Sequence, residues 1–147
     1  MCYFRYKALL LALLSIASAT AAVAADTPVR VVVTNVVKKD GVLLAGVYSS
    51  SETWLSGDTV ASKDVSVPGN VRDGTVTFDM PLPPGSYALS VLQDLNGNRK
   101  LDLNFIGIPK EPSGSSNDAK ATFSAPKFRD AVFSVGDQPV ELRIRLN

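Results

Sequence analysis

Apolar and polar residues alternate along several short stretches of the chain, most regularly near its C-terminal end. There, Val140, Leu142, Ile144 and Leu146 alternate with Glu141, Arg143 and Arg145. Successive side chains of a strand point to opposite faces, so this pattern predicts a β-strand with one buried and one exposed face.

Six further runs, rich in β-branched or aromatic residues, also predict strands. They span residues 28–37, 42–49, 63–67, 74–80, 87–92 and 131–135, with turn residues at 38–41, 68–70, 81–85 and 136–137. About seven short strands with regularly spaced turns predict an all-β, antiparallel β-sandwich of immunoglobulin-like layout. Without internal repeats or a break in composition, residues 25–147 are expected to form a single domain.

Two local features add to this picture. The short connection at residues 38–41 predicts that the runs 28–37 and 42–49 pair as an antiparallel hairpin, because a parallel crossover needs a longer connection. Residues 50–56 interrupt the strand pattern, and Trp54 within them has two interpretations. It either covers the edge of a sheet or provides a stacking platform for a sugar or an aromatic ligand.

The first 24 residues have the layout of a secretory signal peptide. Arg5 and Lys7 precede an apolar stretch at residues 8–17, which is shorter than the about 20 residues that a transmembrane helix needs. Ala22 and Ala24 form a cleavage motif. We therefore expect a periplasmic or extracellular mature chain from residue 25, without a transmembrane segment; a retained membrane anchor is the alternative.

Composition excludes the commonest catalytic sites. The 147 residues include no histidine, and the one cysteine, Cys2, lies in the expected signal peptide. A Ser/His/Asp triad, a Cys/His pair and a zinc site of His or Cys ligands are therefore excluded. Removal of Arg5 and Lys7 from 15 basic residues, against 14 acidic ones, leaves a mature net charge of about −1. Neither nucleic acid nor an anionic surface is therefore an expected partner.

Residues 94–127 show no sustained periodicity, and loops of this length in compact domains often have a function. Oxygen-bearing side chains stand at relative positions 1, 3, 5 and 9, which are Asp94, Asn96, Asn98 and Asp102. Calcium loops use this spacing, because alternate residues of a tight turn direct their oxygens at one centre. Lys100, at position 7, would add its backbone carbonyl. These five residues are the candidate ligands for Ca²⁺.

Two positions differ from the standard calcium loop. Arg99 stands at position 6, where glycine allows the sharp turn, and Phe105 stands at position 12, where a glutamate usually chelates the ion. Further oxygens would come from Asn104, Glu111, Asn117 or Asp118. The nearby positive charges indicate a weak site, with a Kd of about 10⁻⁴ to 10⁻³ M.

The same polar residues allow two other interpretations. Asp94, Asn96 and Asn98 could bond to their own backbone as Asx-turns, without a metal. Alternatively, two carboxylates could form a glycosidase pair, which needs a separation of roughly 5 to 10 Å across a cleft. The candidates for such a pair are Asp94, Asp102, Glu111 and Asp118.

Several motifs occur in a fixed order along the chain. They are LPPGSYAL at residues 82–89, the Asp/Asn loop at 94–102, GIPKE at 107–111, Ser116-Asn117 and PKFRDAVF at 126–133. This order resembles a family of small exported bacterial domains of unknown function, expected to have a transthyretin-like (prealbumin-like) sandwich. The resemblance covers nearly the whole mature chain and implies export and a β-sandwich, without an established activity. The family usually has glycine at the position of Arg99.

Three functional hypotheses arise from these residues. The first is a non-enzymatic module whose calcium-ordered loop presents a surface to a glycan, a peptide or another envelope or extracellular partner. The second is a structural or accessory envelope protein without metal, whose sheet edge pairs with another chain. The third is a carboxylate-based hydrolase, which a cleft lined by paired carboxylates would favour.

Overall fold

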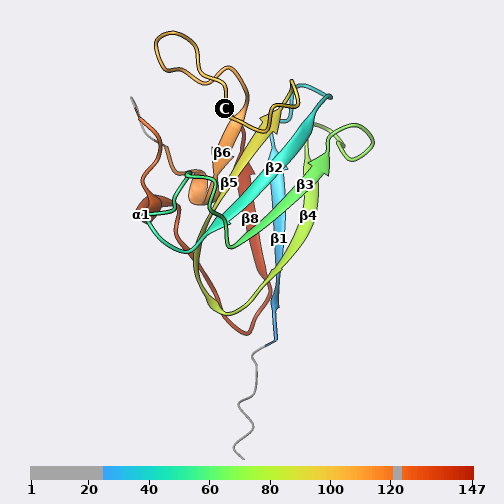
Figure 1. Ribbon diagram of the computed structural model, residues 1–147. Helices are drawn as coiled ribbons and strands as arrows, with labels where there is room; N and C mark the ends of the chain where they lie inside the picture. Colours follow the sequence, from blue (N-terminus) through green and yellow to red (C-terminus); the bar gives the residue numbers. More distant parts are fainter. Residues whose placement is uncertain (1–24, 121–123) are drawn as a thin grey trace, which may run out of the picture.

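Two β-sheets packed face to face make up the domain (Figure 1). The structure is a computed structural model that describes residues 25–120 and 124–147. The predicted all-β sandwich is confirmed, with eight strands in the described residues instead of about seven. The expected signal peptide, residues 1–24, lies outside the described residues.

The smaller sheet has three strands in the order β4-β1-β8. Its central strand β1 (Thr27–Thr34) is antiparallel to β4 (Val76–Leu82) and parallel to β8 (Val140–Arg145). Buried or partly buried residues alternate with more exposed ones along these strands. The period-two pattern of the sequence therefore identified the inner and outer faces of this sheet.

The larger sheet has five strands. Its path runs β3 (Ala61–Ser66), β2 (Val42–Tyr48), β5 (Gly85–Asp94) and β6 (Ser113–Ser115), and β7 (Phe133–Val135) also pairs with β5. β5 pairs with three other strands, which confirms the prediction of a central strand. The long loop of the sequence analysis leaves this sheet at the end of β5.

The core lies between the two sheets and consists of aliphatic and aromatic side chains from both. Fully buried members include Val29, Val31 and Val33 of β1, Leu43 and Val47 of β2, Leu89 of β5 and Ile144 of β8. Burial of each such side chain stabilises the fold by about 1.5 to 3 kcal/mol. This packing holds β5 in a fixed position and thereby fixes where the long loop begins.

The predicted hairpin between residues 28–37 and 42–49 is wrong, because β1 and β2 lie in different sheets. The connection between them crosses the sandwich. Asn35 and Gly41 take positive φ values of 62° and 81°, and Val36 is buried in the core on the way. Alternation identifies a strand, but it does not identify the strand's partner.

Other differences occur where the pattern is short or absent. The predicted strand 131–135 is preceded by a single helical turn, α1 (Phe128–Ala131), which takes in its first residue, and the strand itself is β7. Inside the long loop, β6 and a 3₁₀ turn, η1 (Ser116–Asp118), were not predicted. Their Ser- and Gly-rich sequence has neither alternation nor β-branched residues, so their conformation depends on tertiary contacts.

Trp54 covers the end of β2 and joins it to the C-terminal part of the chain. Its ring meets Tyr48 edge to face, with centroids 5.1 Å apart, and meets Phe128 at 6.0 Å. Its indole N–H donates to the carbonyl of Pro126 at 2.8 Å. These contacts support the interpretation of Trp54 as a cover for the sheet edge.

The end of β5 leaves no space for a side chain at Gly41. A Cβ there would lie 2.2 Å from the carbonyl oxygen of Asp94, and the residue also has a φ of +81°. Gly41→Ala is expected to lower the free energy of unfolding by about 3 kcal/mol, from backbone strain and overpacking together.

Gly69→Ala is the matched control for this prediction. Gly69 has a similar φ of +85°, but no atom lies within 4 Å of its added Cβ. Only backbone strain of about 1 kcal/mol should result. Urea denaturation of the two variants measures the difference, and equal losses would show that the approach of Gly41 to Asp94 does not limit stability.

Candidate functional site

The candidate site is the first part of the long loop, directly after β5. Gln93 and Asp94 end the strand, and the loop returns at Pro112, whose carbonyl accepts the N–H of Gln93 at 2.8 Å. The loop projects beyond the end of the five-stranded sheet, at the top of Figure 1. A rigid strand end on either side therefore fixes its base.

The carboxylate of Asp94 organises the turn. One oxygen accepts the N–H of Gly97 at 2.7 Å and that of Asn96 at 3.3 Å, and the other accepts the N–H of Arg99 at 2.8 Å. Asp94 is only 3% exposed. Burial by itself raises the pKa of this carboxyl, but the backbone N–H groups of the loop outweigh burial and hold the pKa below its usual value.

The side chains of Asn96, Asn98 and Asp102 meet on one side of the turn. The amide nitrogen of Asn96 donates to Asp102 Oδ2 at 2.5 Å, and that of Asn98 donates to both Asp102 oxygens at 3.1 Å. The amide oxygens accept backbone N–H groups two residues ahead, that of Asn98 at 3.0 Å and that of Lys100 at 2.9 Å. The structure thus brings three of the candidate side chains together, whereas the Asp94 carboxylate bonds to backbone N–H groups inside the turn. Asp94, Asn96 and Asn98 form the Asx-turns that the sequence suggested.

Arg99 takes the backbone conformation that glycine usually provides at this position. Its φ is 61°, in the left-handed region. The guanidinium group pairs with Asp64 of β3, with N–O distances of 2.6 and 3.3 Å. The arginine that the sequence analysis treated as a departure from the calcium loop therefore keeps the turn's shape and ties the loop to the sheet.

Glu111 closes the loop from its other end. One carboxylate oxygen accepts the N–H of Leu95 at 2.9 Å and the other accepts the N–H of Asp102 at 3.4 Å. The side chain is buried. Glu111 is one of the additional oxygen donors that the sequence suggested, and its carboxylate therefore lies next to the candidate ligands.

The other residues named from the sequence have different partners. Asn117 donates to the carbonyls of Asp130 and Val132, and Asp118 accepts the N–H of Arg145 in β8. Asn104 accepts N–H groups further along the loop, and the Lys100 side chain is exposed. Asn117 and Asp118 therefore stabilise the junction of η1 with α1 and β8.

The loop ends in a cluster of exposed apolar side chains that the sequence analysis did not single out. We call this cluster the apolar tip; it comprises Leu101, Leu103, Phe105, Ile106 and Ile108. Phe105 is 99% exposed. The sequence does contain a signal for the apolar tip, because apolar residues are concentrated around Gly107. That segment was interpreted only as a source of oxygen ligands.

A metal ion at this loop would need amide ligands as well as carboxylates. Across the part of the chain that the structure describes, no three Asp, Glu, His or Cys side chains are grouped so that they could hold a metal ion. A cation at the loop would therefore need amide or carbonyl oxygens in addition to Asp94 and Asp102.

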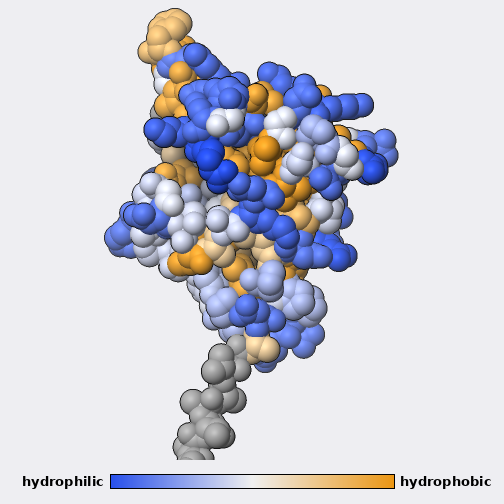
Figure 2. Space-filling view, turned by 45° about the vertical axis from the view of Figure 1, so that its right-hand side comes forward, coloured by the Kyte–Doolittle hydropathy of each residue, from blue (hydrophilic) through white to orange (hydrophobic). Residues whose placement is uncertain are grey.

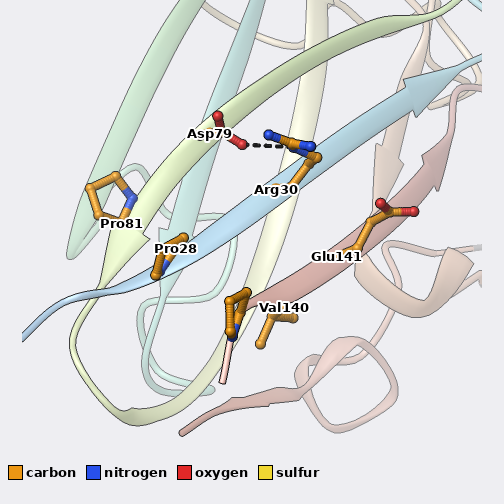
Figure 3. A pocket seen from close by; sticks show the side chains of 7 residues that line it. Pro28, Arg30, Asp79, Pro81, Val140 and Glu141 are labelled. Atoms are coloured by element: carbon orange, nitrogen blue, oxygen red, sulfur yellow. Dashed lines mark hydrogen bonds and ion pairs between the residues drawn. The ribbon is translucent and has the colours of Figure 1, made fainter. Parts of the chain in front are cut away.

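A shallow depression lies elsewhere, on the outer face of the three-stranded sheet. Figure 3 shows Arg30 of β1 donating to Asp79 of β4, with Glu141 of β8 on the neighbouring strand. The Arg30 Nε to Asp79 Oδ1 distance is 3.0 Å, and both side chains are more than half exposed. The carboxylates considered for a glycosidase pair do not line this depression.

Helices long and apolar enough to cross a membrane are absent from residues 25–120 and 124–147.

The fold and the loop define a class: a small β-sandwich domain with a self-bonded Asp/Asn loop at one end of its central strand. A family model described as "Uncharacterized protein conserved in bacteria (DUF2141)" matches residues 31–143, and the chain belongs to that family. The family of unknown function that the sequence motifs resembled is thereby confirmed. No curated protein and no solved structure matches the chain.

The depressed pKa of Asp94 makes part of the stability dependent on pH. Because the folded pKa lies below the unfolded value, this contribution is present above about pH 4 and is lost as the pH falls through the folded pKa. Asp94→Asn is expected to lower the free energy of unfolding at pH 7 by about 2 kcal/mol and to flatten its decline in acid. Urea denaturation between pH 2 and 7, in steps of about one unit, measures both effects.

Asp58→Asn is the control, since Asp58 is an exposed carboxylate outside the loop. An acid dependence that is the same for both variants would contradict a special role for Asp94.

The left-handed backbone at Arg99 gives a second prediction. Arg99→Ala and Arg99→Gly both remove the ion pair with Asp64, but only glycine relieves the strain at a φ of 61°. The glycine variant is therefore expected to be about 1 kcal/mol more stable than the alanine variant. Thermal unfolding of the two proteins tests this ranking, and an alanine variant of equal or higher stability would contradict it.

Proposed function

We propose that this protein is an exported, non-enzymatic β-sandwich module whose long loop is ordered by Ca²⁺ and presents a binding surface to a partner in the periplasm or outside the cell. The observation that carries the proposal is the grouping of Asn96, Asn98 and Asp102 beside the turn that Asp94 organises. The sandwich holds the loop, and the loop carries the binding surface.

The donor set suits calcium. Hard divalent cations such as Ca²⁺ take six to eight oxygen ligands, and amide and carboxylate oxygens each have two lone pairs. The Asn96 and Asn98 amide oxygens each accept one backbone N–H, which leaves one lone pair for an ion. Asp94, Asn96, Asn98 and Asp102 would supply side-chain oxygens and Lys100 its carbonyl.

Calcium would replace the present contacts of Asp102. Its carboxylate now accepts the amide groups of Asn96 and Asn98. An ion between these side chains exchanges the hydrogen bonds that the two amide groups donate to the Asp102 carboxylate for attraction between a divalent cation and that carboxylate. The left-handed backbone at Arg99 supports this proposal, since it gives the turn that calcium loops obtain from glycine.

Thermal unfolding of the chain from residue 25 in calcium, in magnesium and in excess chelator tests this proposal. At a calcium concentration tenfold above Kd, binding to the native state adds about 1.4 kcal/mol, which raises Tm by roughly 5 °C. Magnesium should have little effect, because it prefers a tighter octahedral site.

The calcium-dependent difference in Tm is compared within each variant, because Asp94→Ala also removes hydrogen bonds and lowers Tm on its own. Asp94→Ala should abolish the difference between calcium and chelator, whereas the control Asp58→Ala should keep it. Coinciding curves in all three buffers for the unmodified protein would overturn the calcium proposal.

A second candidate function is a structural or accessory envelope protein without metal. The observation that favours it is that the loop already satisfies its polar groups through Asx-turns and through Glu111. Coinciding unfolding curves, as above, would support this candidate.

A further inference from the structure

The apolar tip is a narrow hairpin that extends from the base of the loop. Leu103 and Pro109 form an antiparallel bridge, and Lys110 donates its N–H to the carbonyl of Asp102 at 2.8 Å. Figure 2 shows a hydrophobic projection at the top of the molecule, surrounded below by hydrophilic surface. The projection is convex in this view.

Asn104 organises the backbone of the tip through its side chain and its main chain. The side-chain oxygen of Asn104 accepts the N–H groups of Ile106 and Ile108 at 3.0 and 2.9 Å. Its main chain exchanges bonds with Ile108 and Gly107, and Pro109 has no N–H to satisfy. These bonds lower the cost of moving the turn out of water, because each unpaired backbone group costs several kcal/mol in an apolar medium.

Basic residues stand on both arms of the hairpin below the tip. Lys100 lies on the outgoing arm and Lys110 on the returning arm, and both are exposed. The nearby carboxylates of Asp102 and Glu111 keep their negative charges, but Asp102 is half-buried and Glu111 is buried, whereas both lysines are exposed. The end of the loop therefore combines a fully exposed aromatic side chain with positive charge close behind it.

We propose that the apolar tip inserts into an anionic lipid bilayer, with Phe105 and Ile106 in the acyl boundary and Lys100 and Lys110 at the headgroups. Interfacial anchors bury apolar groups about 5 to 10 Å deep and add electrostatic attraction to anionic lipids. The hairpin beyond the Leu103–Pro109 bridge reaches about 7 to 10 Å, at a rise of roughly 3.3 Å per residue. The length of the tip and the position of its lysines thus match such a surface.

This inference deepens the proposed function by naming the partner of the loop's binding surface. It differs from the expectation based on net charge, because the mature chain as a whole is close to neutral. The attraction depends on the charges close to the apolar tip, since those more than about 8 to 10 Å away are largely screened at physiological salt. Among these nearby charges, Lys100 and Lys110 are exposed, whereas Asp102 is half-buried and Glu111 is buried.

Co-sedimentation with lipid vesicles tests the inference. Vesicles of equal parts phosphatidylglycerol and phosphatidylcholine should bind the chain from residue 25, and vesicles of phosphatidylcholine alone should bind it at least tenfold more weakly. Phe105→Trp should show quenching by brominated acyl chains, because residue 105 would lie at their depth. Trp54, which contacts Tyr48 and Phe128 at the edge of the sandwich, provides a constant background.

Variants separate the apolar and the electrostatic contributions. Phe105→Ser with Ile106→Ser should reduce vesicle binding at least tenfold without lowering Tm, because both side chains are exposed. Each of Lys100→Gln and Lys110→Gln should reduce binding about fivefold and weaken its salt dependence. Val60→Ser is the matched control: Val60 is also an exposed apolar residue, 55% exposed, but it bonds to Val47 near the opposite end of β2.

Running these assays in calcium and in chelator distinguishes the two proposals. Vesicle binding without any calcium effect on Tm would support the membrane inference and overturn the calcium proposal. A calcium-dependent Tm without vesicle binding under either condition would support the calcium proposal and overturn the membrane inference. If the tip variants change the oligomeric state in the absence of lipid and leave vesicle binding unchanged, the tip contacts protein and the membrane inference is overturned.

Discussion

The burial of two apolar sheet faces against each other is the constraint on which the rest of this structure depends. It fixes β5 between β2 and the short strands β6 and β7, and it therefore fixes the point where Asp94 leaves the sheet. Gly41 packs so closely against this strand end that a Cβ on it would lie 2.2 Å from the Asp94 carbonyl oxygen. A loop that begins at such a position can keep a defined shape although its own sequence has no regular period.

Strand positions could be predicted from the sequence because successive side chains of a strand point to opposite faces of its sheet, one buried and one exposed. β8 and β5 are examples, with their apolar rows buried as expected. Pairing could not be predicted, since β1 and β2 are adjacent in the sequence but belong to opposite sheets. Val36, buried at the crossing, resembled the end of a strand because a β-branched residue fits either role.

The part of the candidate site that depends on the spacing of polar residues along the chain could be predicted. The positions of Asp94, Asn96, Asn98 and Asp102 follow from a local turn, and local turns can be inferred from sequence. The pairing of Arg99 with Asp64 depends on a distant strand and could not be inferred. The apolar tip was missed for a related reason: Phe105 could equally have been a core residue, and only the fold shows that it is exposed.

The parallel pairing of β1 with β8 places the two ends of the domain far apart. Val29 pairs with Val140 and Thr34 with Arg145, so both strands run toward the end of the sandwich that carries the loop. Asn147 exchanges backbone bonds with Ser113, close to the returning arm, whereas Thr27 lies at the opposite end (Figure 1). A protein tethered through its N-terminus would present the loop outward, and a label fused after Asn147 would sit beside it.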